Sequence, residues 1–204
     1  YKFSFKILLK IIKIGLPASF SMIIMSLGGA SFNRILVEFS SEAVAAFQIG
    51  IRLDHFFLIP AISISTSVVT LVGMFYGAKK FKLAKEITLY AIRSTLLIGI
   101  LIGFIFFIFS DNIVSIFSDN TNIQNISSQY LRYFVFGYPF IAISMISGRA
   151  MQGLGKGIPM LVLTLLRVLV ISIAFSVFFV FFLNKSIEWV WISQVISVII
   201  SALI

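Results

Sequence analysis

The sequence predicts an all-α integral membrane protein, a bundle of six membrane-crossing helices. Of its 204 residues 60% are hydrophobic and 11% are charged, whereas about a quarter of the residues in a soluble protein carry charge. The charged residues gather in five clusters, which divide the chain into six apolar stretches. These stretches are continuously apolar and most exceed the roughly 20 residues that a crossing helix needs, which excludes the shorter, alternating strands of a membrane barrel.

The expected crossings follow one another with short polar connections and form one domain, residues 1–204. They cover residues 11–37, 43–76, 87–109, 126–154, 159–182 and 189–204. The first 16 residues carry four lysines and no small-residue cleavage site, so we interpret this stretch as an amphipathic lead-in to the first crossing and not as a signal peptide. Because the chain does not begin with Met and its last apolar stretch has only 16 residues, we expect a fragment that is cut at both ends.

The second crossing is too long for a straight helix that runs perpendicular to the membrane. Its 34 residues would make a helix of roughly 51 Å, against a hydrocarbon core of about 30 Å. Pro60 lies near its middle and removes a backbone hydrogen bond there, so we expect a bend at that point. Pro60 is either a structural kink or a hinge for transport.

The charges differ between the two sides of the membrane if successive helices alternate in direction. The side that includes the amino end carries eleven Lys and Arg residues against one acidic residue, and the other side carries four against six. The positive-inside rule places the amino end in the cytoplasm, and we expect a bacterial plasma membrane. The net charge of +9 then faces anionic lipid head groups, so the lipid bilayer is the expected partner and nucleic acid is not.

Ionisable residues inside membrane helices are costly, so each one is a functional candidate. Arg167 lies eight residues into the fifth crossing, roughly 12 Å deep at the helical rise, and the sequence shows no carboxylate that we expect at that depth. It is either a structural clamp or a residue that contacts substrate or coupling ion.

A second polar group lies near the outer part of the second crossing, at Arg52, Asp54 and His55. The simpler interpretation is a charge cluster at the membrane interface. The alternative is a polar wall of an outward-opening cavity, with Gln48 and Arg52 on one helix face.

The sequence lacks the residues that an enzyme acting within the membrane needs. Hydrolysis within a membrane needs paired carboxylates, a nucleophile with a base, or a metal site, and the chain has one His and no Cys. We therefore expect no catalytic residue, no metal site and no cofactor.

Several motifs resemble the second half of a multidrug and toxic compound extrusion (MATE) transporter, and they extend over nearly the whole chain. They are Gly15-Leu16-Pro17 at the start of the first helix, NRIL at residues 33–36, AVAAFQIGIRLD from Ala43, Pro60, LVGMFYGAKK at residues 71–80, RAMQGLGKGIPML at residues 149–161, and LLRVLVISIAF at residues 165–175.

The resemblance implies that this chain is the carboxy-terminal six-helix lobe of a two-lobe transporter in the multidrug/oligosaccharidyl-lipid/polysaccharide exporter superfamily. It implies an amino-terminal six-helix lobe as partner, small organic substrates that are often cationic or aromatic, and export driven by Na⁺ or H⁺. The general pattern is two bundles that rock around a central site.

Two departures from the family pattern concern the coupling ion. One branch of the family has a glutamate in the first helix of this half, where this chain has Met22 and Met25, and an aspartate in the tenth crossing, where residues 133–153 contain no carboxylate. We therefore place the coupling site in the amino-terminal half.

The remaining polar, aromatic and Met residues of the helices suit loose recognition of apolar substrates, because Met side chains repack easily and aromatic faces attract cations; ordinary helix packing is the alternative. The candidate residues along the substrate path are Met22, Met25, Asn33, Phe47, Gln48, Arg52, Tyr138, Met145, Gln152 and Arg167. Two other functions stay open: a lipid-linked oligosaccharide flippase, which needs several Arg or Lys residues in its cavity, and a membrane scaffold subunit that transports nothing.

Overall fold

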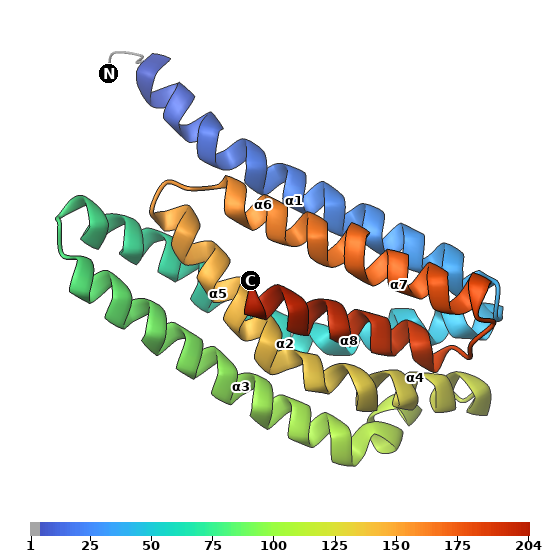
Figure 1. Ribbon diagram of the computed structural model, residues 1–204. Coiled ribbons are helices and arrows are strands. Elements are labelled where there is room, and N and C mark those ends of the chain that lie inside the picture. Colours follow the sequence, from blue (N-terminus) through green and yellow to red (C-terminus); the bar gives the residue numbers. More distant parts are fainter. Residues whose placement is uncertain (1–4) are drawn as a thin grey trace.

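The computed structural model describes residues 5–204, which form six helical runs joined by short connections (Figure 1). Lys2 of the predicted lead-in lies outside the described residues, as do the side chains of Lys6 and Lys10. The first three runs are single helices, and the next two change helix type along their length. The elements are α1 (Phe5–Val37), α2 (Ser41–Gly77), α3 (Phe81–Ser115), α4 (Thr121–Phe134), η1 (Val135–Gly137), α5 (Tyr138–Gly153), α6 (Ile158–Leu165), η2 (Leu166–Ile173), α7 (Ala174–Val177), η3 (Phe178–Phe182) and α8 (Glu188–Leu203).

The first five runs are long and apolar enough to cross a membrane, and α8 is a shorter apolar helix. The prediction of an all-α membrane bundle is therefore confirmed. The lead-in is continuous with α1 from Phe5 onward, and α3 begins at Phe81, six residues before the predicted start of its crossing. These extensions are helical because the lysines of both segments are good helix formers and polar enough to continue a helix beyond the apolar core.

Polar residues between the apolar runs cap the ends of the helices. The Ser40 side chain accepts a hydrogen bond from the Ala43 N–H at 3.0 Å, and the Asn120 side chain accepts bonds from the first turn of α4. These bonds satisfy backbone donors that have no partner within the helix. At the opposite end of the bundle, Lys79 and Gly155 adopt positive φ angles of 58° and 81° and turn the chain after α2 and α5.

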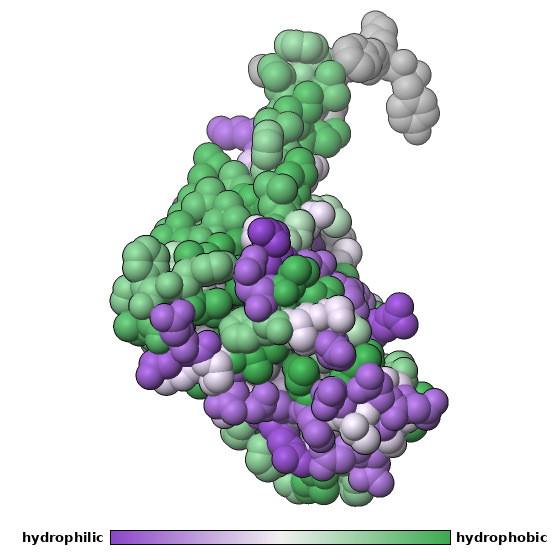
Figure 2. Space-filling model, turned by 90° about the vertical axis from the view of Figure 1, so that its right-hand side faces the viewer, coloured by the Kyte–Doolittle hydropathy of each residue, from purple (hydrophilic) through white to green (hydrophobic). Residues whose placement is uncertain are grey.

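The helices pack in two groups, which α8 joins. In one group α2 contacts α3, α4 and α5; in the other α1 lies along α6 and η2, and α8 contacts η2, α4 and α5. Figure 1 shows α1 and the α6–η3 run side by side, apart from α3. Figure 2 looks onto the end of the bundle where α2, α4 and α8 begin, and hydrophilic residues gather there while the flank behind it is hydrophobic. This distribution suits a bundle that presents its sides to lipid.

The long second helix, α2, continues through Pro60 as one unbroken helix. The residue with non-helical angles lies instead in α3, at Phe109 (φ −103°, ψ 19°). The hinge role of Pro60 stays a prediction.

Candidate functional site

A cavity of about 520 Å³ opens between the two groups of helices. Residues from α1, α2, α4, α5, α6, η2 and α8 line it, and most of them are apolar. Its polar lining includes Asp54, Arg149, Arg167 and Gln194. A predominantly apolar cavity of this size with a few converging polar groups is typical of a small-molecule site.

Asp54 is the one carboxylate among the described residues that lines this cavity, and only 4% of its surface is exposed. Its two oxygens each accept a hydrogen bond from a tyrosine: the Tyr130 hydroxyl donates to Oδ2 at 2.6 Å, and the Tyr138 hydroxyl donates to Oδ1 at 2.7 Å. Among the described residues no Lys, Arg or His nitrogen pairs with it within 4.0 Å. The group is thus hydrogen-bonded but has no counter-charge.

Two small residues allow the tyrosines to reach Asp54. Gly50 lies one turn before Asp54 on α2, and a Cβ atom there would collide with the Tyr130 ring. Gly99 of α3 lies against the pair formed by Tyr138 and Phe57, whose rings stack with centroids 4.6 Å apart. The tyrosine rings therefore lie directly on the backbones of α2 and α3, which fixes their hydroxyls beside the carboxylate.

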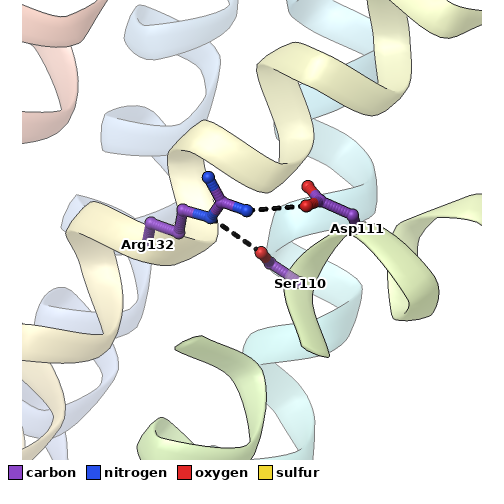
Figure 3. Close-up of polar contacts among 3 residues, drawn as sticks. All are labelled: Ser110, Asp111 and Arg132. Carbon is purple, nitrogen blue, oxygen red and sulfur yellow. Dashed lines mark hydrogen bonds and ion pairs between the residues drawn. The ribbon is translucent and has the colours of Figure 1, made fainter. Parts of the chain in front are cut away.

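Arg132 attaches α4 to α3, two residues after Tyr130. Its Nε donates to the buried Ser110 hydroxyl at 2.9 Å, and its Nη2 donates to Asp111 at 2.6 Å (Figure 3). Residues two apart on a helix point in different directions. One turn of α4 thus contacts α3 through Arg132 and α2 through Tyr130.

The two arginines of the cavity are held differently. Arg149 donates from Nη1 to the Gln152 side-chain oxygen at 3.1 Å, while its buried Nε has no hydrogen-bond partner among the described residues. Arg167 lies in η2, a stretch of π-helix, and forms no ion pair within the described part of the chain. A π-helical segment is wider than an α-helix and often marks a functional site.

Four further side-chain atoms are buried without a partner among the residues described: the Gln194 amide nitrogen, the Trp191 indole nitrogen, and the hydroxyl oxygens of Thr95 and Ser176. Gln194 is 8% exposed and lines the cavity. A buried donor without an acceptor costs about 1–3 kcal/mol, so a bound molecule or water that supplies the acceptor recovers this cost. In the described part of the chain no three His, Asp or Glu residues come together as they do in a metal site.

The structure separates the sequence-predicted candidates into two sets. The residues that line the cavity are Met22, Met25, Phe47, Tyr138, Met145 and Arg167, and the residues that do not line it are Asn33, Gln48, Arg52 and Gln152. Gln48 and Arg52 are exposed on another face of α2, where Gln48 donates to Asn33 at 3.0 Å. Gln152 is buried beside Arg149. The role of each along a substrate path stays a prediction.

The interpretation of Arg52, Asp54 and His55 as one charge cluster at the membrane interface is wrong for Asp54. Asp54 is buried and lines the cavity, whereas Arg52 and His55 are exposed. Arg167 lines the same cavity, and the expectation that no carboxylate lies at its depth stays a prediction. The helical spacing contains the signal that separates these residues. Asp54 is in phase with the apolar and small residues of the buried face of α2, which are Ala43, Ala46, Phe47, Gly50, Leu53, Phe57 and Ala61, and Arg52 is not.

Comparisons with known proteins agree on one family. A family model described as MatE matches residues 17–178. The chain is 26% identical over 93% of its length to a probable multidrug resistance protein NorM of Thermotoga maritima, covering 41% of that protein, and 23% identical over 83% of its length to the probable multidrug resistance protein YpnP of Bacillus subtilis, covering 38%.

The solved structures show the same fold. An outward-facing multidrug resistance MATE transporter of the MOP superfamily superposes with a TM-score of 0.95 at 25% identity, over 100% of this chain and 46% of that one. A MOP superfamily transporter from Pyrococcus furiosus, described as having a binding pocket of reverse polarity that suggests a different function, gives 0.93 at 25% identity, over 100% and 46%. The chain therefore spans less than half the length of the relatives and structures it matches.

Proposed function

The chain belongs to the MatE family of membrane transporters, and we propose that it forms the carboxy-terminal six-helix lobe of a cation-coupled exporter. The whole protein exports organic, often cationic or aromatic compounds by alternating access, in exchange for Na⁺ or H⁺. Its other lobe is a similar six-helix bundle on the amino-terminal side, and the amino end of this chain faces the cytoplasm. The coding region upstream of Tyr1 tests the first part, because it must encode such a bundle.

The observation that carries this proposal is the cavity and its lining. Its volume of about 520 Å³ lies in the range of sites for drug-sized molecules. Met22, Met25 and Met145 offer adaptable side chains, and Phe47 and Tyr138 offer aromatic faces. This combination favours substrates that have apolar area and positive charge in common, and it does not require that they have one fixed shape.

Dye export tests the proposal directly. The full-length protein is produced in bacteria that lack their own drug exporters, and the accumulation of a fluorescent cationic dye is measured with and without an ionophore that collapses the ion gradients. We expect low accumulation that rises when the gradients collapse. Accumulation equal to that of cells without the protein, for every cationic and aromatic compound tried, contradicts export and favours the scaffold alternative.

A matched pair of substitutions connects export to this cavity. Met145→Trp adds bulk inside the cavity, whereas Met74→Trp adds the same bulk on an exposed part of α2 outside it. We expect Met145→Trp to reduce export of large dyes at least tenfold more than export of small ones, because the lost volume excludes large molecules first. Met74→Trp must leave both unchanged, and an equal effect of the two substitutions contradicts the assignment.

One observation favours a second candidate function. The cavity has two arginines, Arg149 and Arg167, whereas its only carboxylate, Asp54, is hydrogen-bonded to two tyrosines. This balance suits an amphipathic anion, such as the phosphate of a lipid-linked oligosaccharide. Competition assays against dye export separate the candidates: inhibition by anionic amphiphiles that Arg149→Gln and Arg167→Gln abolish supports the second, and inhibition by cations alone supports the first.

A further inference from the structure

We propose that Asp54 is a proton-binding residue of this lobe, held at the cavity wall by the hydroxyl groups of Tyr130 and Tyr138. The proposal deepens the proposed function, since a coupled exporter needs a group that takes up and releases the coupling ion. The site differs from the positions that the family resemblance pointed to, because it lies on α2 and neither Met22 nor Met25 on α1 supplies an acid. It also replaces the expectation that the coupling site lies in the amino-terminal half alone.

The cost of a buried charge is the first argument. An ionised carboxylate that is 4% exposed and has no cation within 4.0 Å among the described residues has lost most of its hydration without a compensating charge. Uptake of a proton removes that cost. The carboxylate becomes a carboxylic acid by forming one O–H bond, while a hydronium ion loses the same proton by breaking one of its O–H bonds and becomes water.

The two tyrosines supply the opposing effect. Both donate to the carboxylate, at 2.6 and 2.7 Å, and hydrogen bonds to an ionised group are about twice as strong as those between neutral groups. They stabilise the ionised form, so neither form is excluded by its surroundings. A structural carboxyl group needs only the hydrogen bonds, whereas a group that must bind and release a proton requires surroundings that tolerate both of its forms.

Access to the cavity gives the proton a route. Asp54 is among the residues that line it, so water that fills the cavity reaches the carboxyl group. A sodium ion fits the site less well, because it requires several oxygen ligands, and both tyrosine hydroxyls already donate to the only carboxylate. A proton needs one oxygen lone pair.

None of the other titratable groups around the site replaces Asp54 as the proton-binding residue. Those that line the cavity are Tyr130, Tyr138, Arg149 and Arg167, while the described side chains that α1, α6 and α8 contribute to its lining do not titrate. On α2, the exposed His55 ring contacts the Ile51 carbonyl through Nδ1 at 2.6 Å, and Arg52 is exposed. On α3, the residues that meet Phe57 and Tyr138 are Gly99 and Gly103.

Infrared difference spectroscopy tests the proposal on the full-length protein in lipid. Spectra are recorded at neutral and at mildly acidic pH, and the variants are Asp54→Asn, Asp54→Glu and Asp111→Asn. We expect a carboxylic-acid C=O band to develop on acidification in the wild type, to be absent in Asp54→Asn, and to persist in Asp54→Glu. Asp111 is an exposed carboxylate paired with Arg132, so its substitution must leave this band in place.

The tyrosines provide a second readout that does not depend on how well Asp54→Asn folds. Tyr130→Phe and Tyr138→Phe each remove one hydrogen bond to the carboxyl group, so each must shift the frequency of the same band. A wild-type spectrum without a band that Asp54→Asn removes means that Asp54 keeps one protonation state throughout, and this overturns the proposal. A band that neither Tyr→Phe variant shifts overturns it as well.

Transport assays keep this proposal distinct from the proposed function. Loss of proton-driven dye export in Asp54→Asn together with loss of the band supports both. Export by Asp54→Asn with unchanged pH dependence refutes the proton role and leaves the exporter in place. The Asp54 band in a protein that exports no compound refutes the exporter and leaves the proton site in place.

Discussion

Replacing Gly50 by Ala tests how α2 and α4 build the site. The added Cβ would overlap the Tyr130 ring, which is 1% exposed and is packed against the rings of Phe47 and Trp191. Overpacking costs about 1–3 kcal/mol, and the displaced hydroxyl loses a bond to a charged group worth about 1.5–3 kcal/mol. Alanine recovers about 1 kcal/mol of helix propensity. We expect a net loss of about 3 kcal/mol in the free energy of unfolding.

Gly50→Ala should change the free energy of unfolding in the opposite direction when the Tyr130 ring is absent. In a Tyr130→Ala background neither the overlap nor the hydrogen bond exists, so Gly50→Ala should stabilise the protein by about 1 kcal/mol. In a Tyr130→Phe background the overlap remains without the hydrogen bond, so an intermediate loss of about 1 kcal/mol is expected. The comparison of backgrounds isolates the contact between the two residues.

The assay is unfolding of the full-length protein by SDS in mixed micelles, followed by helical circular dichroism. The fluorescence of Trp191 reports on the site itself, because its ring lies 5.0 Å from that of Tyr130. Gly15→Ala is the control, since in the described part of the chain no atom beyond its own stretch of helix backbone lies within 4 Å of the added Cβ, and it should be neutral or slightly stabilising. An equal effect of Gly50→Ala in all three backgrounds refutes the reasoning.

Three further predictions concern other parts of the bundle. Gly153→Ala should destabilise the protein by about 1–3 kcal/mol in the same unfolding assay, because its Cβ would lie 2.7 Å from the Val69 carbonyl oxygen of α2; a neutral result contradicts the close α2–α5 packing. Asp111→Ala should cost less than about 1 kcal/mol there, since both partners of its ion pair with Arg132 are about half exposed or more; a larger loss means that the pair is essential. A cysteine placed at Lys79 should react with a membrane-impermeant reagent only from the cytoplasmic side; labelling from outside reverses the proposed orientation.

The fold could be predicted from the sequence because lipid leaves few alternatives. A backbone in hydrocarbon must satisfy its own hydrogen bonds, so apolar runs separated by charge define the helices. Their exact ends follow local chemistry instead: α3 begins at Phe81 because Lys82, Lys85 and Glu86 continue the helix into the polar region. The π-helical turns of η2 and η3 have no counterpart in the hydropathy pattern, and Arg167 lies in the first of them.

The site was predicted less completely, and the reason lies in tertiary contacts. Hydropathy shows that Arg52, Asp54 and His55 are polar, but it does not show which of them faces the bundle. The decision depends on the small surface of Gly50 and on Tyr130, which comes from a helix far along the chain. The phase of Asp54 within the buried stripe of α2 was readable, and the two hydroxyls that meet it were not.

Transport by the purified full-length protein in lipid vesicles tests the central claim most directly. A cation gradient is imposed across the vesicle membrane, and movement of a cationic dye against its own gradient is measured. The account predicts uptake or release that requires the cation gradient and falls when Met145→Trp narrows the cavity. Dye movement that does not depend on the cation gradient contradicts the account. The absence of any dye movement in vesicles whose protein is folded contradicts it as well.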